Sequence, residues 1–300
     1  MKQRASLLVN VLLAVSCFWL SGCIPFIGKT KYSEELDFSL NGVGATKIDA
    51  RTTNGAIALI GSVTDQIQVH AWKDVWSSSE ADAKEFAKEV KISAVREGNI
   101  VKVYYEHPKL SWGRSVSVRY DIQGPALIQA DLRTTNGKID IRQIEGPVDA
   151  VTTNGGVQLE GGKDSIKLTT TNGKIGLRNS SGRIKARTTN GGIEGFIADL
   201  SRESEFSTTN GSIDISVMKG SASLSISTTN GSIKLALPTD FSGQLDAAVF
   251  NGRISSEIPT SKSESTKKKL TGELGAGGEA KIELRTTNGN INLWKNESAK

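Results

Sequence analysis

Side chains that could act as catalytic bases or metal ligands are few in this chain. His70 and His107 are the only two histidines, and neither stands in the sequence context of a catalytic triad. Cys17 and Cys23 are the only cysteines, and no group of His, Asp or Glu has the spacing of a metal site. No glycine-rich phosphate loop precedes a helix. We therefore expect neither a metal nor a cofactor.

Three carboxylates could serve carbohydrate chemistry. Asp140, Glu194 and Asp214 each stand four residues after an Asn of a repeated motif, on the side chains expected to face outward. A glycosidase needs two carboxylates about 5 to 10 Å apart beside a sugar platform. Phe196 is the only aromatic residue near this column. A lyase-like or glycosidase-like enzyme is therefore an alternative, and we expect a non-catalytic protein.

Aromatic residues that could bind a ligand gather early in the chain. Trp72, Trp76 and Trp112 lie in one segment, with Tyr104 and Tyr105 between them, whereas the repeats contain few aromatics. Exposed aromatic side chains are good contact surfaces for glycans and protein partners. The three Trp residues are therefore the candidate binding residues, and packing inside a cap is the structural alternative for each.

The N-terminus has the pattern of an export signal. Residues 1–4 are basic and residues 5–20 are uncharged and mostly apolar, which is too short for a membrane span of about twenty residues. The following Leu20-Ser21-Gly22-Cys23 resembles the lipobox of bacterial lipoproteins, which implies a signal peptide over 1–22 and acylation of Cys23. Residues 23–46 lack sustained periodicity and are predicted to form a lipidated tether. Removal of Cys17 with the signal leaves no disulfide within the mature chain.

This anchor predicts a place in the cell envelope. Ile24 follows the acylated Cys, whereas an Asp there would signal retention at the inner membrane of Gram-negative bacteria. We therefore expect the outer membrane in a Gram-negative source and otherwise the outer face of the cell membrane. The chain has 37 basic and 32 acidic residues, and loss of Lys2 and Arg4 leaves a net charge of about +3. So small a charge predicts no nucleic-acid partner.

A short repeat dominates the rest of the chain. Thr-Thr-Asn-Gly occurs eight times, and Phe250-Asn251-Gly252 is a degenerate ninth copy. Most copies follow one another after 18 to 21 residues, with a large early insertion and a smaller late one. The repeated Asn residues are Asn54, Asn136, Asn154, Asn172, Asn190, Asn210, Asn230, Asn251 and Asn288.

Apolar residues around each Asn keep the period of two that is typical of strands. In one copy Ile166, Leu168, Thr170 and Asn172 share one parity, so the first Thr and the Asn are expected to face the core. A hairpin meander and a coiled solenoid both fit this pattern. The solenoid is favoured, because coiling buries the apolar face between two sheets. It also lets inward Asn amides satisfy one another in a structural ladder.

The repeat also resembles a known family. Thr-Thr-Asn-Gly-x-Ile-x-Leu, a helix-bearing early insertion and Leu-Thr-Gly-Glu-Leu-Gly before Lys281-Ile282-Glu283-Leu284 are similar to the bacterial putative-adhesin β-solenoid family, a domain of unknown function. The likeness covers about residues 45–294. It implies a β-solenoid with a surface or envelope role.

The predicted architecture is therefore an all-β solenoid, a single-stranded β-helix of 18–21-residue coils over residues 47–294. An insertion at 61–125 is expected to form a small α+β cap, with a helix at 79–91 and strands at about 91–96, 99–106 and 116–123. The late insertion at 257–277, rich in Ser and Lys, is expected to be a basic solvated loop.

Three functions follow from this sequence. The first is a lipid-anchored envelope protein that acts in adhesion or binds an envelope glycan or protein partner without catalysis. The second is an envelope-stress component that acts through a protein partner. The third is the carbohydrate-active enzyme.

Overall fold

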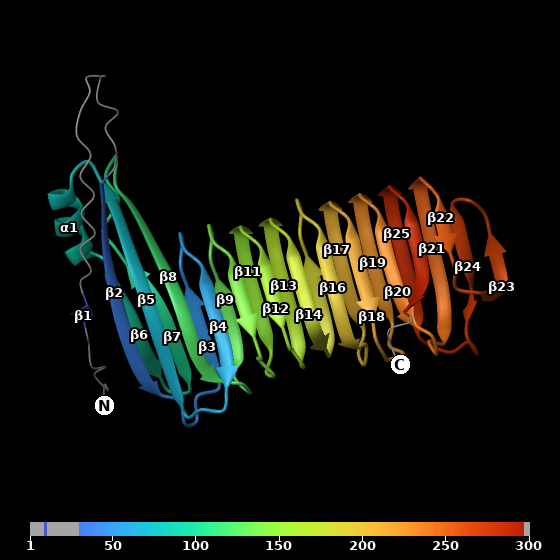
Figure 1. The fold of residues 1–300 in the computed structure, drawn as a ribbon, viewed down its shortest axis with the longest axis horizontal. Coiled ribbons are helices and arrows are strands. Elements are labelled where there is room, and N and C mark those ends of the chain that lie inside the picture. Colours follow the sequence, from blue (N-terminus) through green and yellow to red (C-terminus); the bar gives the residue numbers. More distant parts are fainter. Residues whose placement is uncertain (1–8, 11–29, 297–300) are drawn as a thin grey trace, which may run out of the picture.

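A computed structural model of the chain describes residues 9–10 and 30–296. Two long sheets of 13 strands each face one another along the whole molecule (Figure 1). Each repeat contributes one strand to each sheet, so one repeat forms one coil. The prediction of an all-β solenoid is confirmed. The signal peptide over 1–22, apart from Val9–Asn10, and the acylation site Cys23 lie outside the described residues.

We call the two layers sheet A and sheet B. In spatial order sheet A contains β1 (Val9–Asn10), β2 (Thr30–Asn41), β5 (Gln66–Ser77), β8 (Ser115–Pro125), β4 (Ile57–Ser62), β10 (Ile139–Arg142), β12 (Val157–Glu160), β14 (Ile175–Ser181), β16 (Ile193–Asp199), β18 (Ile213–Val217), β20 (Ile233–Pro238), β26 (Ile291–Asn296) and β22 (Ile254–Ser256). Sheet B contains β23 (Thr260–Ser265), β24 (Lys269–Leu274), β21 (Gly243–Asn251), β25 (Lys281–Asn288), β19 (Leu224–Asn230), β17 (Ser204–Asn210), β15 (Arg183–Arg187), β13 (Ser165–Asn172), β11 (Val148–Asn154), β9 (Gln129–Arg133), β3 (Lys47–Arg51), β7 (Ile100–Glu106) and β6 (Lys91–Glu97).

Identical repeat positions stack on one another in parallel register. Ile139 pairs with Val157, which pairs with Ile175, and all three side chains are fully buried. Neighbouring parallel strands lie about 4.8 Å apart, so each apolar position forms a column along the solenoid. These columns from the two sheets fill the space between them, which explains the alternation of apolar and polar residues along every strand.

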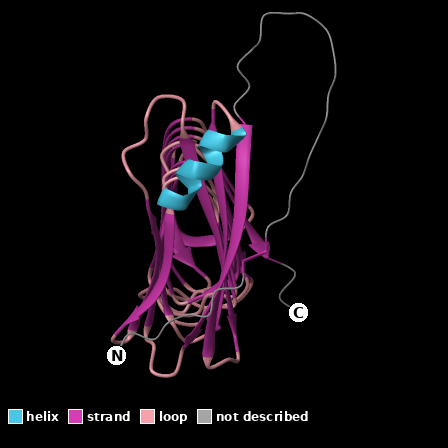
Figure 2. Cartoon of the chain, turned by 90° about the vertical axis from the view of Figure 1, so that its left-hand side faces the viewer, coloured by secondary structure: helices cyan, strands magenta, loops and turns pink. Residues whose placement is uncertain are grey.

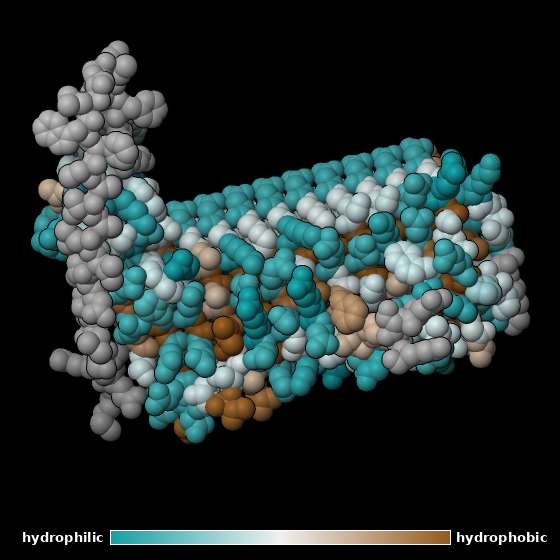
Figure 3. Space-filling model, in the orientation of Figure 1, coloured by the Kyte–Doolittle hydropathy of each residue, from teal (hydrophilic) through white to brown (hydrophobic). Residues whose placement is uncertain are grey.

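One edge of the solenoid carries the repeated motif, and we call it the ridge. It consists, in each repeat, of the residues from the one before the first Thr to the one after the Gly, and it forms the hydrophilic upper edge in Figure 3. Along it the side-chain amide nitrogen of each Asn donates to the side-chain oxygen of the Asn in the neighbouring coil over 2.6 to 2.8 Å. Asn54, at the first coil, donates instead to the Val116 carbonyl. The side chains of this ladder are exposed, except that Asn54 is half-buried, so the expectation that they face the core is wrong. The chain turns between the sheets at the Asn, and the strand parity ends there.

The first Thr and the Gly of the motif hold the coils at this spacing. Thr170 is buried, and its hydroxyl donates to the Gly155 carbonyl of the preceding coil over 2.8 Å. A Cβ placed on Gly173 would lie 1.9 Å from that same carbonyl oxygen. Only glycine fits this close approach.

A cap covers the N-terminal end. In sheet A, β2, β5 and β8 pair antiparallel, and helix α1 (Glu80–Glu89) begins after its N-cap Ser79 and packs on β5 and β2 (Figure 2). Buried Lys73 ties this cap together, because its ammonium contacts Glu34 at 2.7 Å and the Ala87 carbonyl at 2.8 Å. The prediction of a tether over 23–46 is therefore wrong for 30–41, which form β2. Within the described part of the chain, no helix has the length and apolar character needed to cross a membrane.

The C-terminal end closes in an order that departs from the chain order. Strands β25 and β26 lie between the seventh coil, β19 and β20, and the outer coil, β21 and β22. The hairpin β23–β24 then pairs antiparallel with β21 and covers the end of sheet B. The prediction of a solvated loop over 257–277 is wrong here, because an edge hairpin can be polar on its exposed side.

Candidate functional site

The three predicted Trp residues all lie on the surface. Trp72 and Trp76 project from the outer face of β5 and are half-buried. Trp112 is fully exposed on the loop between β7 and β8. None of them packs inside the cap, so each is accessible to a ligand in a different degree.

Trp72 is already engaged by its neighbours. The Arg119 guanidinium lies 3.7 Å from its ring centre, and the His70 ring meets it edge-on at 4.0 Å. His70 in turn contacts the carboxylates of Asp37 and Glu35 on β2. With Arg119 over its ring, Trp72 is not an open platform for a sugar.

Trp76 and Trp112 lie toward the same end of the cap. Trp76 pairs across strands with Ser115, which follows the Trp112 loop by three residues. The Lys31 ammonium lies 5.5 Å from the Trp76 ring centre. The structure therefore groups Trp76 and the Trp112 loop at the ridge side, with Trp72 further down the face.

A shallow groove of about 510 Å³ lies over β2, β5, β8 and β4. Ala58 and Ile60 form part of its apolar lining, and Asp37 and Asp121 bring carboxylates to it. His70 pairs with Asp37 on one side and with Asp121 on the other in the strand register. Apolar lining with a few placed polar groups is the usual composition of a binding site.

A second feature adjoins this groove and was missed from the sequence. Val43, Val63 and Leu127 stand exposed on three turns at the edge opposite the ridge, and Leu127 is 79% exposed. The turns are neighbours, because Gly42 N–H donates to Asp65 and Ala126 N–H donates to Ser62. Together with exposed Ile60 of the groove we call these residues the turn patch. Apolar residues in turns, where polar ones are expected, are the sequence signal that could have found it.

The candidate catalytic carboxylates do not form a catalytic pair. Glu194 and Asp214 are register neighbours, and Glu194 is paired with Lys174. Burial alone would raise the pKa of Asp140, but hydrogen bonds from Lys138 and Arg142 hold it below its ordinary value, whereas a general acid needs a raised pKa. Among the residues that the structure describes, no group of three or more His, Cys, Asp or Glu could hold a metal ion.

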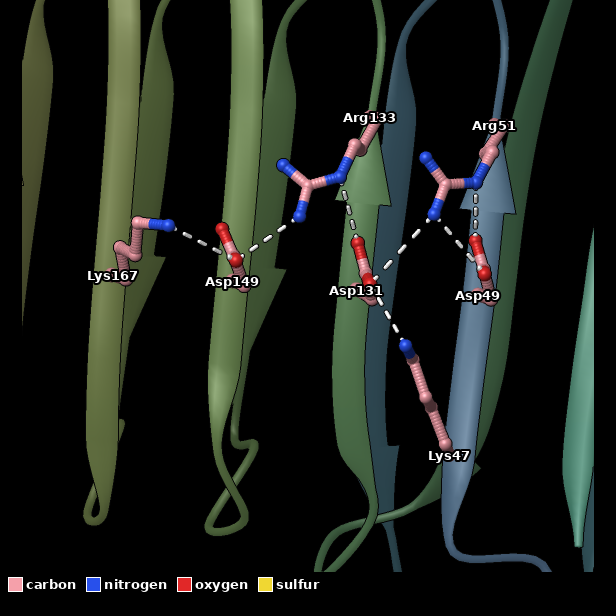
Figure 4. Close-up of polar contacts among 7 residues, drawn as sticks. All are labelled: Lys47, Asp49, Arg51, Asp131, Arg133, Asp149 and Lys167. Atoms are coloured by element: carbon pink, nitrogen blue, oxygen red, sulfur yellow. Dashed lines mark hydrogen bonds and ion pairs between the residues drawn. The ribbon is translucent and has the colours of Figure 1, made fainter.

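An ion-pair network covers the start of sheet B on its outer face (Figure 4). It consists of Lys47, Asp49, Arg51, Asp131, Arg133, Asp149 and Lys167. Three Asp residues stack on adjacent strands, which alone would be destabilising. Burial would raise the pKa of Asp131, but the Lys47 hydrogen bond and the charges of Arg133 and Arg51 hold it below its ordinary value. Four cations thus neutralise the three carboxylates, and the ion pairs join neighbouring coils.

Comparison with known proteins agrees with this architecture. Residues 164–294 match the family model described as Toastrack DUF4097. A putative adhesin from Parabacteroides merdae is similar over 87% of this chain and 96% of its own, with 11% identity and a TM-score of 0.52. A putative adhesin from Parabacteroides distasonis is similar over 88% and 97%, with 11% identity and a TM-score of 0.51.

At this identity the two structures show a shared fold. No curated protein matches the chain. The resemblance inferred from the repeats is confirmed by the family model and by these folds. Residues 164–294 are therefore similar to the Toastrack family of domains of unknown function.

Proposed function

We propose that this chain is a non-catalytic, lipid-anchored envelope protein whose solenoid presents a docking surface for a protein partner. The observation that carries the proposal is the turn patch beside the groove. Single exposed apolar residues are common on any protein. Here four of them gather on adjacent turns and the neighbouring strand, and such a cluster is typical of a protein contact.

The chemistry of this surface favours a protein over a glycan. The exposed side chains are aliphatic, whereas sugar sites use open aromatic faces, and Trp72 is covered by Arg119. Asp37, Asp121 and Asp65 supply acidic groups around the patch. A partner with an apolar centre and basic flanks would complement it.

The anchor is proposed from the lipobox-like Leu20-Ser21-Gly22-Cys23. Acylation there would keep the protein on an envelope membrane, the outer membrane in a Gram-negative source. Adhesion and an envelope-stress role that acts through a partner both require such a contact. The names of the similar folds agree with a surface role.

A pull-down from the native envelope with the intact lipidated protein tests the docking surface. Leu127→Asp and Val63→Asp should abolish retention of a partner that the wild type holds, because a buried carboxylate at the centre of an apolar contact is costly. Both residues are exposed in the free protein, so the melting temperature should not change.

Val95→Asp is the matched control, since Val95 is an exposed aliphatic residue on β6 of sheet B. Retention of the same partner by all four proteins would refute the turn patch. Co-sedimentation with purified peptidoglycan that is lost only in Trp76→Ala would point to a glycan instead. Absence of an acyl group on Cys23 by mass spectrometry would refute the anchor.

A further inference from the structure

The two edges of the solenoid differ in charge. The nine motif segments of the ridge contain no Asp or Glu. Their cations are Arg51, Arg133, Lys138, Lys174, Arg187, Arg253 and Arg285. The turns of the opposite edge carry the acids Asp65, Glu145, Asp164, Glu203, Asp240, Glu257 and Glu279, and the bases Lys163, Arg202 and Lys219. The ridge is therefore the basic edge of the molecule.

Five of these seven cations are paired with carboxylates on the strands. Arg133 and Arg285, for example, are paired with Asp149 and Asp246 on the strand faces below the ridge. Arg187 and Arg253 have no carboxylate partner in the described structure. In these ion pairs the cation nevertheless lies closer to the ridge than its carboxylate does. An anionic surface that approaches the ridge therefore encounters the cations first.

Exposed apolar residues also differ between the two edges, apart from Val95 and Phe196, which lie within strands. The turn patch on the acidic edge is aliphatic. The ridge side carries two exposed aromatic rings at opposite ends of the molecule, Trp112 on the cap loop and Phe250, which is 68% exposed, in the outermost coil. Aromatic rings with neighbouring Lys and Arg are typical of residues at a membrane interface.

Of these two aromatic rings, Phe250 at the C-terminal end has the more strongly basic surroundings. The turn between β23 and β24 lies against the ridge, because the Lys268 and Lys267 carbonyls accept from Val249 and Ile254. The Lys268 ammonium lies 5.6 Å from the Phe250 ring centre, and Arg253 is three residues further along the chain. At the other end Lys109 flanks Trp112, and α1 adds carboxylates, of which Asp82 and Glu85 are paired with Arg114 and Lys88. The C-terminal end therefore supplies most of the attraction.

The place where the anchor joins the fold lies on the same side. Thr30 begins β2 opposite Ser77, and this end of the cap extends beyond the level at which Val118 N–H donates to Asn54 of the ridge. Figure 1 shows the ridge rising toward its C-terminal end, so that this end and the cap loop both lie at the upper side.

The length of the tether excludes the opposite edge. Seven Cα steps separate Cys23 from Thr30, a reach of about 25 Å. The 12 residues of β2 span about 40 Å down to the turn patch. A molecule standing on its acidic edge would hold Thr30 beyond the reach of an acylated Cys23.

We propose that the ridge side faces an anionic lipid membrane, with the Trp112 loop and the Phe250, Arg253, Lys267 and Lys268 cluster as its two contacts. This orientation rests on the proposed acylation of Cys23, and it turns the groove's turn patch away from the bilayer, where a partner can reach it. The lipid class is set by the charge: an anionic headgroup such as phosphatidylglycerol.

Energy transfer from labelled protein to an acceptor lipid tests the orientation. Thr229→Cys and Ser221→Cys place one dye near either end of β19, on the ridge and on the opposite edge, in the lipidated full chain. On phosphatidylglycerol vesicles the Thr229→Cys dye should transfer far more energy than the Ser221→Cys dye. On phosphatidylcholine vesicles the difference should shrink.

Variants isolate the charge. The double variant Lys267→Gln with Lys268→Gln should bind with its ridge toward the bilayer less often. The ratio of molecules in this orientation to molecules in other orientations should fall about fivefold for each cation removed. Arg202→Gln with Lys219→Gln, an equal charge change on the opposite edge, should leave that ratio unchanged. Equal transfer from both dyes on anionic vesicles, or no effect of the ridge variant, would overturn the orientation.

The proposed acylation and the proposed orientation can be refuted independently. Mass spectrometry of Cys23 reports acylation alone. If the chain is not acylated, flotation of the unlipidated chain with phosphatidylglycerol vesicles tests the ridge directly: binding that the ridge variant loses supports it, and no binding overturns it.

Discussion

Replacement of Gly173 by Ala tests the idea that the coil spacing is set at the ridge. The added Cβ would lie 1.9 Å from the Gly155 carbonyl oxygen, whereas real Cβ atoms keep at least 3.0 Å. The two coils must therefore separate locally by about 1.1 Å, the difference between these distances. The Asn172 to Asn154 bond of 2.8 Å would lengthen beyond hydrogen-bond range.

Three bonds between the coils cross this point. Besides the Asn bond, Thr170 donates to the Gly155 carbonyl over 2.8 Å, and Gly155 N–H donates to the Asn172 carbonyl over 3.2 Å. At about 1 kcal/mol each, their loss should lower the free energy of unfolding by about 3 kcal/mol. For a chain of this size the melting temperature should fall by roughly 6 to 12 °C.

Gly176→Ala is the matched control in the same coil. There a Cβ would meet only the end of the Gln158 side chain, which can rotate away. Urea unfolding followed by circular dichroism should place this variant within about 0.5 kcal/mol of the wild type. If both glycine variants unfolded at the wild-type midpoint, the close approach would not be a constraint on the fold.

Other substitutions address the ladder, the ion network and the cap. Asn172→Ala should cost about 1 kcal/mol of unfolding free energy, while Asn172→Asp should cost more at neutral pH and recover in acid, because its carboxylate faces an oxygen of the ladder; equal loss at all pH values would contradict this. Because the folded pKa of Asp131 is lowered, the stability it contributes is present at neutral pH and lost as the pH falls through that pKa. Urea midpoints of the wild type and Asp131→Asn should therefore converge as the pH falls below the ordinary pKa range of an Asp carboxyl, and parallel curves would argue against it. Lys73→Met should lower the unfolding free energy by about 3 kcal/mol by leaving Glu34 without its cation, and Lys73→Met with Glu34→Leu should recover part of the loss; no recovery would place the cost in packing.

The repeat made the solenoid predictable, whereas the strands that close its ends were not. Equivalent positions of successive coils stack on one another and need similar residues. Such residues therefore recur at the length of one repeat, which makes the motif visible in the sequence. Strand β2 was missed because one of its inward positions is Glu34, which is accommodated only by Lys73 from a strand 39 residues away. The alternation of apolar and polar residues in the sequence of β2 is therefore incomplete. Strands β23 and β24 read as a loop because their sequence is rich in Ser, Thr, Lys and Glu, and their described residues include only two buried apolar side chains, Leu270 and Leu274.

The candidate site shows the same division between local and spatial information. The sequence identified the aromatic residues of the cap but not their neighbours, so it could not show that Arg119 covers Trp72. Apolar residues in turns single out Val43, Val63 and Leu127 one by one, but the sequence does not show that they come together, because their turns are adjacent only through the pairing of β2, β4, β5 and β8.

The position of β25 and β26 has a consequence for how the chain can fold. The outer coil, β21 and β22, pairs with no coil except the one that β25 and β26 form, since β21 meets β25 and β22 meets β26. A chain emerging from its N-terminus can stack seven coils in order, but the next one has nothing to rest on until residues 281–296 arrive. Completion therefore waits for the last part of the chain, and a chain truncated before Lys281 should leave its final coil and capping hairpin detached, however well the first seven coils have formed.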